Sequence, residues 1–131
     1  MAYIKFKELT HYFNFYKELE IKDLPAYVHH YLSEGEDIWA VYSTSRDKCL
    51  FSDRKIVLFD RKEMFGIVKK IHFLPYKNIS STAILFKRSS VSILLTMDSG
   101  YQLRLNYVRM DASEKERIRK VYYKMVEKID K

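Results

Sequence analysis

Histidine and cysteine are the side chains with which this sequence would hold a metal ion. The histidines are His11, His29, His30 and His72, and the single cysteine is Cys49. His29 and His30 are adjacent, so on a helix their rings point about 100° apart, and neither has an acidic or cysteine partner at ligand spacing. Cys49 falls in an apolar run, which favours a small core side chain over a reactive thiol. We therefore expect no metal and no cofactor.

The common catalytic motifs are missing from the sequence. It has no glycine-rich phosphate loop, no G-x-S-x-G nucleophile turn and no paired carboxylates beside an apolar pocket pattern. A catalytic reading would need a cleft that holds a titratable group with a perturbed pKa. We predict that the chain is not an enzyme.

Basic side chains are the strongest candidates for a ligand site. The formal net charge is +7, and the excess falls on residues 36–131. Arg46 and Lys48 lie around one polar turn, and Arg61 and Lys62 lie in a later charged turn, which together predict an anion site. A basic surface attracts lipid headgroups, nucleic acid and acidic proteins without choosing among them. A scattered, solvated surface explains the same charges.

Nucleic acid is a competing partner for this positive charge, because the eleven tyrosines offer stacking platforms for bases. Most aromatic residues fall on predicted core stripes, however. The sequence also has no RNP-like and no helix-turn-helix signature. These features rank nucleic acid below protein as the expected partner.

The composition indicates one folded domain. The chain has 131 residues, 47% of them hydrophobic, which is enough for a core. A single cysteine excludes an internal disulfide, and the N-terminus lacks the apolar stretch of a secretory signal. No apolar run reaches the roughly 20 residues that cross a bilayer. We expect a cytoplasmic protein that is at most peripheral at the membrane.

The first 35 residues predict a helical extension. Apolar residues recur three or four positions apart over residues 4–20, which is typical of an amphipathic helix; they are Phe6, Leu9, Phe13, Tyr16 and Leu19. A second, short helix follows over residues 26–32, with Asp23 as its N-cap and Gly35 beyond its end. The first stripe has no evident place in a compact core. We therefore expect it to mediate self-association, or else to cover a face of its own chain.

Residues 36–131 predict a second unit, which contains seven strands and one helix. Short runs with a period of two indicate strands over residues 38–42, 48–51, 55–59, 66–75, 79–86, 91–97 and 101–107. The tail predicts a helix over 112–129, with a capping box of Ser113 and Glu116. Its apolar stripe, formed by Ile118, Val121, Tyr122, Met125 and Ile129, should face the same core as Tyr101, Leu103, Leu105 and Tyr107.

Three motifs in this order resemble those of bacterial pleckstrin-homology (PH) domains. The segment 24–38 is similar to their short helix followed by L-x-x-G-E-x-I. The segment 51–60 is similar to their T-D-x-R-x-x-x-x-D hairpin, with Ser52 in place of the threonine and Lys55 directly after Arg54. Phe73-Leu74-Pro75-Tyr76-Lys77-Asn78-Ile79 is similar to their I-P-Y-x-x-I step.

The resemblance implies a PH-like, seven-stranded antiparallel barrel with a C-terminal capping helix, here preceded by the N-terminal helical extension. It also implies frequent homo-oligomerisation and no catalytic residue. Phosphoinositide-binding PH domains hold basic residues in the turn where this chain has Arg46 and Lys48. Their first strand also carries a lysine, where this chain has Trp39 or Val41. We predict a non-enzymatic protein-interaction and self-assembly module, with peripheral binding of acidic lipid or nucleic acid as the alternative.

Overall fold

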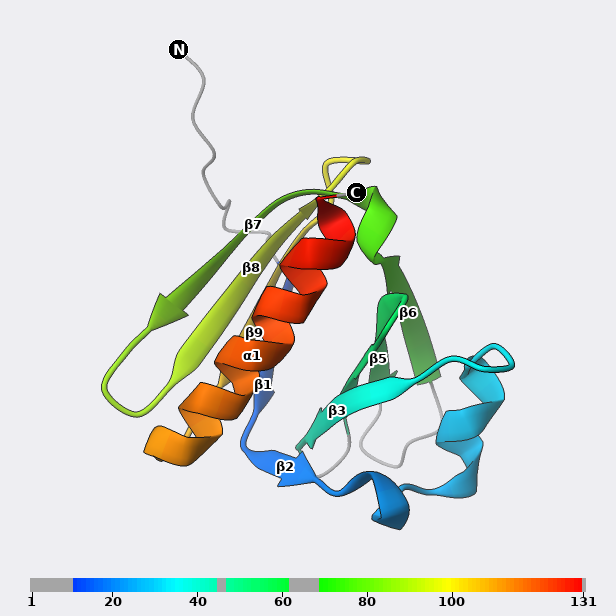
Figure 1. Cartoon of the computed structure of the whole chain (residues 1–131), viewed down its shortest axis with the longest axis horizontal. Coiled ribbons are helices and arrows are strands. Elements are labelled where there is room, and N and C mark those ends of the chain that lie inside the picture. The colour runs from blue at the N-terminus through cyan, green and yellow to red at the C-terminus, as the bar shows by residue number, and fades with distance from the viewer. Residues whose placement is uncertain (1–10, 45–46, 62–68, 131) are drawn as a thin grey trace.

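The computed structural model describes residues 11–44, 47–61 and 69–130, and it describes residues 11, 12, 61 and 69 by their backbone alone. These residues form two sheets and one long helix (Figure 1). The five-stranded sheet is antiparallel and contains, in spatial order, β2 (Lys17–Leu19), β3 (Ile38–Ser43), β4 (Lys48–Ser52), β5 (Lys55–Arg61) and β6 (Lys69–Pro75).

The four-stranded sheet contains, in spatial order, β1 (His11–Phe15), β9 (Gln102–Tyr107), β8 (Val91–Met97) and β7 (Ile79–Phe86). β1 runs parallel to β9, and the other pairs are antiparallel. Helix α1 (Ala112–Ile129) packs across this sheet (Figure 1). The described residues also contain three short 3-10 helices: η1 (Ile21–Asp23), η2 (Ala26–Tyr31) and η3 (Tyr76–Asn78).

The prediction of a closed, seven-stranded barrel is wrong. All seven predicted strands are present, as β3 to β9, but β1 and β2 precede them, and the strands form two separate sheets. The first three residues of the predicted strand 66–75 lie outside the described residues. The sheets separate at Pro75, because proline has no N–H to continue the ladder and η3 then turns the chain into β7.

The prediction of a helix over residues 4–20 is wrong for residues 11–19, which form β1 and β2. Phe13 and Phe15 are buried with a period of two, and Asn14 between them is exposed. The described apolar residues are spaced as in a helix because they are divided between β1 and β2, which belong to different sheets. Phe6 and Leu9 lie outside the described residues.

Strands β1 and β2, together called the N-terminal arm, belong to different sheets and are joined at Tyr16. The backbone N–H of Tyr16 donates to the Ser43 carbonyl at 3.1 Å, and the N–H of Val108 donates to the Phe15 carbonyl at 2.8 Å. Arg117 of α1 also donates hydrogen bonds to Glu18 Oε1 from its Nε at 3.1 Å and from its Nη2 at 2.9 Å. The arm therefore belongs to the packed body of the described chain.

The main core lies between α1 and the inner faces of the sheets. Leu103, Leu105 and Tyr107 share it with Ile118, Val121 and Met125, while Tyr101, Tyr122 and Ile129 pack at its margin. The predicted shared core is thus confirmed. The helix has the predicted bounds, but its capping box lies two residues earlier than the predicted one: Asp111 accepts the Glu114 N–H at 2.8 Å, and Glu114 accepts the Asp111 N–H at 3.1 Å.

A second, smaller core covers the other face of the five-stranded sheet. Val28 of η2 is fully buried there against Val41, Leu50, Val57 and Phe59. The predicted short helix is therefore confirmed as η2, although Pro25 takes the N-cap position predicted for Asp23. Gly35 follows it with a φ of 77°, the left-handed conformation expected of a glycine there.

Candidate functional site

The predicted anion site is only partly within the described residues. Arg46 and Lys62 lie outside them, and Arg61 is described by its backbone in β5. Lys48 opens β4, and its Nζ donates to the Tyr27 hydroxyl at 3.0 Å and lies 5.5 Å from the centre of the Tyr27 ring. Its ammonium group is thus tied to η2, and the anion site stays a prediction because most of its side chains lie outside the described residues.

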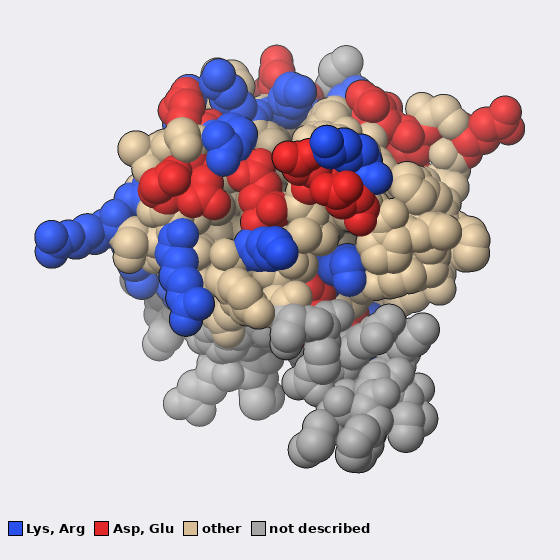
Figure 2. All heavy atoms as spheres, turned by 90° about the horizontal axis from the view of Figure 1, so that it is seen from below, with Lys and Arg blue, Asp and Glu red and all other residues tan. Residues whose placement is uncertain are grey.

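Positive charge does not gather into one patch on the face that carries β2, η1 and the start of α1. Figure 2 shows blue and red side chains interspersed across the described part of this face. Several of these charges neutralise each other, as in the pairs Glu18–Arg117 and Glu116–Arg119. Mixed charges of this kind weaken long-range attraction of a polyanion.

The histidines with described side chains do not converge. His29 and His30 are exposed on η2, whereas His72 lies on β6, with its Nε2 3.6 Å from the Asp60 carboxylate. In the described residues, no three histidine, cysteine, aspartate or glutamate side chains come close enough to hold a metal ion.

Cys49 is fully buried, with its Sγ 3.3 Å from the Tyr107 hydroxyl. Burial raises the pKa of the Cys49 thiol to about 12. Because a thiol attacks as the thiolate, this group is inert at neutral pH. The predicted core role of Cys49 is confirmed.

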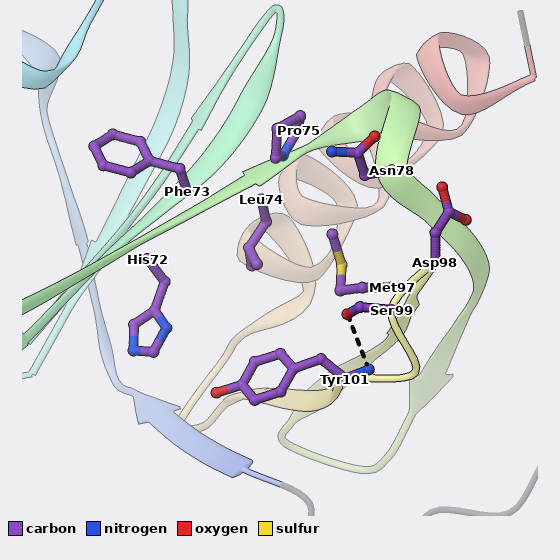
Figure 3. A pocket seen from close by; sticks show the side chains of 9 residues that line it. All are labelled: His72, Phe73, Leu74, Pro75, Asn78, Met97, Asp98, Ser99 and Tyr101. Carbon is purple, nitrogen blue, oxygen red and sulfur yellow. Dashed lines mark hydrogen bonds between the residues drawn. The ribbon is translucent and has the colours of Figure 1, made fainter.

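The corner between β6 and the β8–β9 turn contains a pocket of about 520 Å³ (Figure 3). His72 and Asp98 lie at opposite ends of it, with Leu74 and Met97 between them. The His72 ring packs against Phe13, at 5.8 Å between ring centres. An imidazole, a carboxylate and apolar side chains of this kind can bind a small ligand.

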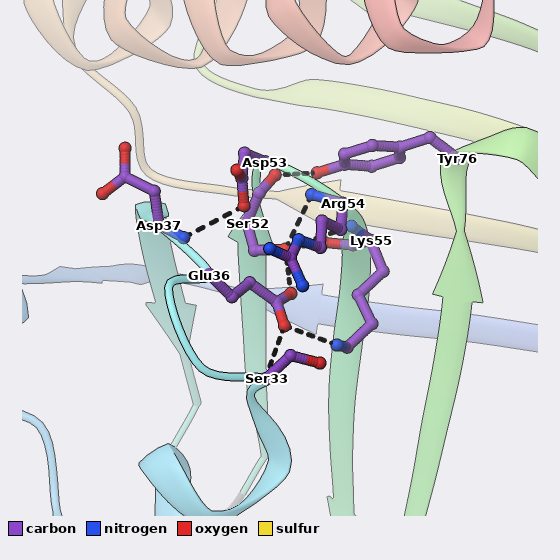
Figure 4. Close-up of polar contacts among 8 residues, drawn as sticks. All are labelled: Ser33, Glu36, Asp37, Ser52, Asp53, Arg54, Lys55 and Tyr76. Atoms are coloured by element: carbon purple, nitrogen blue, oxygen red, sulfur yellow. Dashed lines mark hydrogen bonds and ion pairs between the residues drawn. The ribbon is translucent and has the colours of Figure 1, made fainter.

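The turn before β3 and the β4–β5 turn are joined by a buried acid (Figure 4). The Glu36 side chain is fully buried and accepts hydrogen bonds from Lys55 Nζ at 2.7 Å, from the Ser33 N–H at 2.8 Å and from the Ser52 hydroxyl. Burial by itself would raise the pKa of Glu36. The hydrogen bonds from Lys55, Ser52 and Ser33 outweigh burial and lower that pKa below its ordinary value.

Ser52 is the centre of this hydrogen-bond network. Its Oγ accepts the N–H groups of Arg54 at 3.0 Å and Lys55 at 3.1 Å, and its carbonyl accepts the Tyr76 hydroxyl at 2.7 Å. The Tyr76 ring stacks on Trp39, at 5.8 Å between centres. The three motifs singled out in the sequence therefore meet at one end of the five-stranded sheet, where they hold turns together.

Sequence reasoning missed the ion pair between Glu36 and Lys55. The signal available in the sequence was the position of this acid, between a glycine that adopts the left-handed conformation and an apolar strand. Such a position buries the acidic side chain. The corner pocket had no such signal, because its residues come from β6, η3 and the β8–β9 turn. Among the described residues, no helix combines the length and the apolar character needed to cross a membrane.

Comparison with known proteins matches this arrangement to one family. Residues 9–129 match the model of the bacterial PH domain. Two relatives from Bacillus subtilis (strain 168) are named Uncharacterized protein YozO, 37% identical over 76 residues, and Uncharacterized protein YjqA, 33% identical over 55 residues. These alignments cover 55% and 42% of this chain, and 66% and 44% of the two relatives.

Solved structures show the same fold. A DUF1696 family protein with a pleckstrin-homology domain from Shewanella loihica PV-4 aligns with a TM-score of 0.68 at 18% identity, covering 86% of this chain and 95% of that one. A PH-domain protein from Exiguobacterium sibiricum 255-15 aligns with a TM-score of 0.66 at 15% identity, covering 86% and 61%. With the family match spanning nearly the whole chain, the protein belongs to the bacterial PH domain family.

Proposed function

We propose that this chain is a non-enzymatic interaction module that assembles with copies of itself by pairing along strand β7. The observation that carries the proposal is the free edge of β7. It is the last strand of the four-stranded sheet, and in the described part of the chain no strand pairs with its outer side (Figure 1). An unpaired edge is a template for another strand.

β7 lacks the charges and the proline that protect an edge strand, although its register is irregular between Ile79 and Ser81. Its eight residues, ISSTAILF, include no charge and no proline, and Leu85 and Phe86 are 43% and 46% exposed. By contrast, the edge strand β6 carries lysines and ends in Pro75, and β2 is only three residues long. Lysine, proline and short length are the usual protections of an edge.

A second copy is the partner that fits this edge. A two-fold dimer brings the same surface together from both subunits, so the surface must not repel itself. An uncharged strand meets that condition in an antiparallel pair. Of the self-association stripe expected from the sequence, Phe13 is buried in the core of its own chain and Tyr16 is 44% exposed, whereas Phe6 and Leu9 lie outside the described residues.

The non-enzymatic part of the proposal is supported by the roles of the buried polar groups. Glu36, Ser52 and Lys55 hold turns together, and Cys49 is held neutral in the core. None of these groups is aimed into the corner pocket.

Light scattering on the full chain at high micromolar concentration tests the proposal. The wild type should be a dimer or larger, and Leu85→Lys should be monomeric, because a charge on the edge opposes pairing. Tyr123→Lys is the matched control, since Tyr123 is 64% exposed on α1, away from the edge. A monomeric wild type, or a Leu85→Lys variant that assembles like the wild type, would contradict the proposal.

A further inference from the structure

A pocket of about 390 Å³ lies where three segments far apart in the sequence meet. The β4–β5 turn contributes Arg54, η3 contributes Lys77, and the last turn of α1 contributes Lys128. Helix α1 and η3 are in contact, which brings the third segment to the other two. All three residues are exposed.

The backbone under this pocket is held in place by hydrogen bonds. Arg54 donates its N–H to the Ser52 hydroxyl at 3.0 Å, and its carbonyl accepts the Tyr76 N–H at 3.2 Å. Lys77 directly follows Tyr76, whose buried hydroxyl donates to the Ser52 carbonyl at 2.7 Å. Two of the three cations are therefore carried by segments that bind each other directly.

The three cations are not paired with acidic groups in the described part of the chain. Within the described residues, Arg54, Lys77 and Lys128 make no ion pair, whereas Lys55 at the same pocket is paired with Glu36. The one carboxylate in the lining, that of Asp53, accepts the Asp37 N–H at 3.0 Å. Three cations against one carboxylate leave two positive charges.

We propose that this pocket binds a phosphate monoester, with the phosphoryl group among Arg54, Lys77 and Lys128 and the organic part against Pro75 and Tyr76. A phosphate monoester carries about −1.5 to −2 charge at pH 7, which matches the two positive charges that remain when Lys55 is counted as paired with Glu36, whereas a carboxylate would leave one positive charge unmatched. A guanidinium group also suits phosphate because it donates two parallel hydrogen bonds.

The volume of the pocket falls within the range of about 300–1,000 Å³ that small-molecule sites occupy. Its apolar floor distinguishes it from a simple surface charge cluster. The site also lies at the opposite end of β4 from Lys48. It is therefore a different site from the anion site expected from the sequence.

Titration of the full chain with phenyl phosphate, followed by NMR chemical shifts, tests the proposal. Phenyl phosphate should bind at least about tenfold more tightly than benzoate, which has the same ring but a single charge. Arg54→Gln and Lys128→Gln should each weaken binding at least about fivefold, because each removes a charge-assisted hydrogen bond. Arg88→Gln, at the exposed β7–β8 turn, is the matched control and should bind like the wild type.

The pH dependence of phenyl phosphate binding gives a second test of the proposal. Binding should weaken as the pH falls below about 6, where the phosphate dianion takes up a proton. No binding of phenyl phosphate up to about 10 mM, or equal binding by the wild type and both pocket variants, would overturn the proposal. Unchanged thermal unfolding of the variants would show that the fold is intact.

Vesicles distinguish the two sources of this chemistry. Phosphatidic acid in phosphatidylcholine vesicles presents a phosphate monoester on a membrane, whereas phenyl phosphate presents it in solution. Arg54-dependent binding to such vesicles would identify a lipid headgroup as the source, and Arg54-dependent binding of phenyl phosphate alone would identify a soluble organic phosphate. The pocket is independent of β7, so Leu85→Lys should bind phenyl phosphate normally even if the assembly proposal fails.

Discussion

The Tyr76 hydroxyl donates a 2.7 Å hydrogen bond to the carbonyl of Ser52, and both groups are buried. This bond joins the end of β6 to the β4–β5 turn, across the point where the chain leaves one sheet for the other. It also supports Arg54 and Lys77, which lie on either side of the contact. Removing it should therefore affect both the stability of the fold and the phosphate pocket.

Tyr76→Phe should lower the free energy of unfolding by about 1–3 kcal/mol, because it leaves the buried Ser52 carbonyl without this partner. Denaturant unfolding monitored by circular dichroism measures the change. Tyr123→Phe serves as the control, since Tyr123 is largely exposed. A Tyr76→Phe variant as stable as this control would show that the bond contributes nothing.

Glu36 should make stability depend on pH in the acid range. Its pKa is lower in the folded chain than its ordinary value of 4.5. Its contribution is therefore complete above about pH 4.5 and is lost as the pH falls through the lower, folded value. Glu36→Gln removes this part of the acid dependence, which unfolding curves between about pH 3 and 6 would show as a flatter slope.

Removing the partner of Glu36 should cost more than removing an exposed charge. Lys55→Met leaves a buried carboxylate without its cation, and we expect a loss of about 3 kcal/mol. Lys22→Met is the control, because the Lys22–Glu20 pair is largely exposed and such pairs contribute about 0–1 kcal/mol. Similar unfolding midpoints for the two variants would contradict a structural role for the buried pair.

The N-terminal arm should be part of the folding unit. Phe15 is 1% exposed, so Phe15→Ala should destabilise the chain by about 3–5 kcal/mol. Its neighbour Tyr16 is half-exposed, and Tyr16→Ala should cost less than about 1 kcal/mol. Thermal unfolding of the two variants gives the comparison. Equal, small effects would mean that β1 is dispensable for the core.

Cys49 should not react with thiol reagents in the native state. Because burial raises the pKa of its thiol to about 12, a thiol reagent at about pH 8 should react only when the chain unfolds. The rate of modification with and without denaturant measures this. Rapid labelling of the native chain would show that Cys49 is exposed by local opening.

Most of the fold could be predicted from local patterns of apolar residues in the sequence. The alternation of Leu103, Leu105 and Tyr107 indicated a half-buried strand, and the stripe of α1 indicated its docking face. β1 was wrongly predicted to be helical because its partner β9 lies about 90 residues later in the chain. A parallel pairing over that distance produces no pattern in the local sequence. The phosphate pocket escaped prediction for the same reason, since Arg54, Lys77 and Lys128 come together only after folding.

Hydrogen exchange of the β7 amides at two protein concentrations tests the assembly proposal most directly. If β7 pairs with a second copy, amides within Ile79–Phe86 should exchange more slowly at high micromolar than at low micromolar concentration. The amides of β8, already paired on both sides, should not change. Concentration-independent exchange throughout β7 in a protein that light scattering shows to be assembled would place the interface elsewhere and contradict the account.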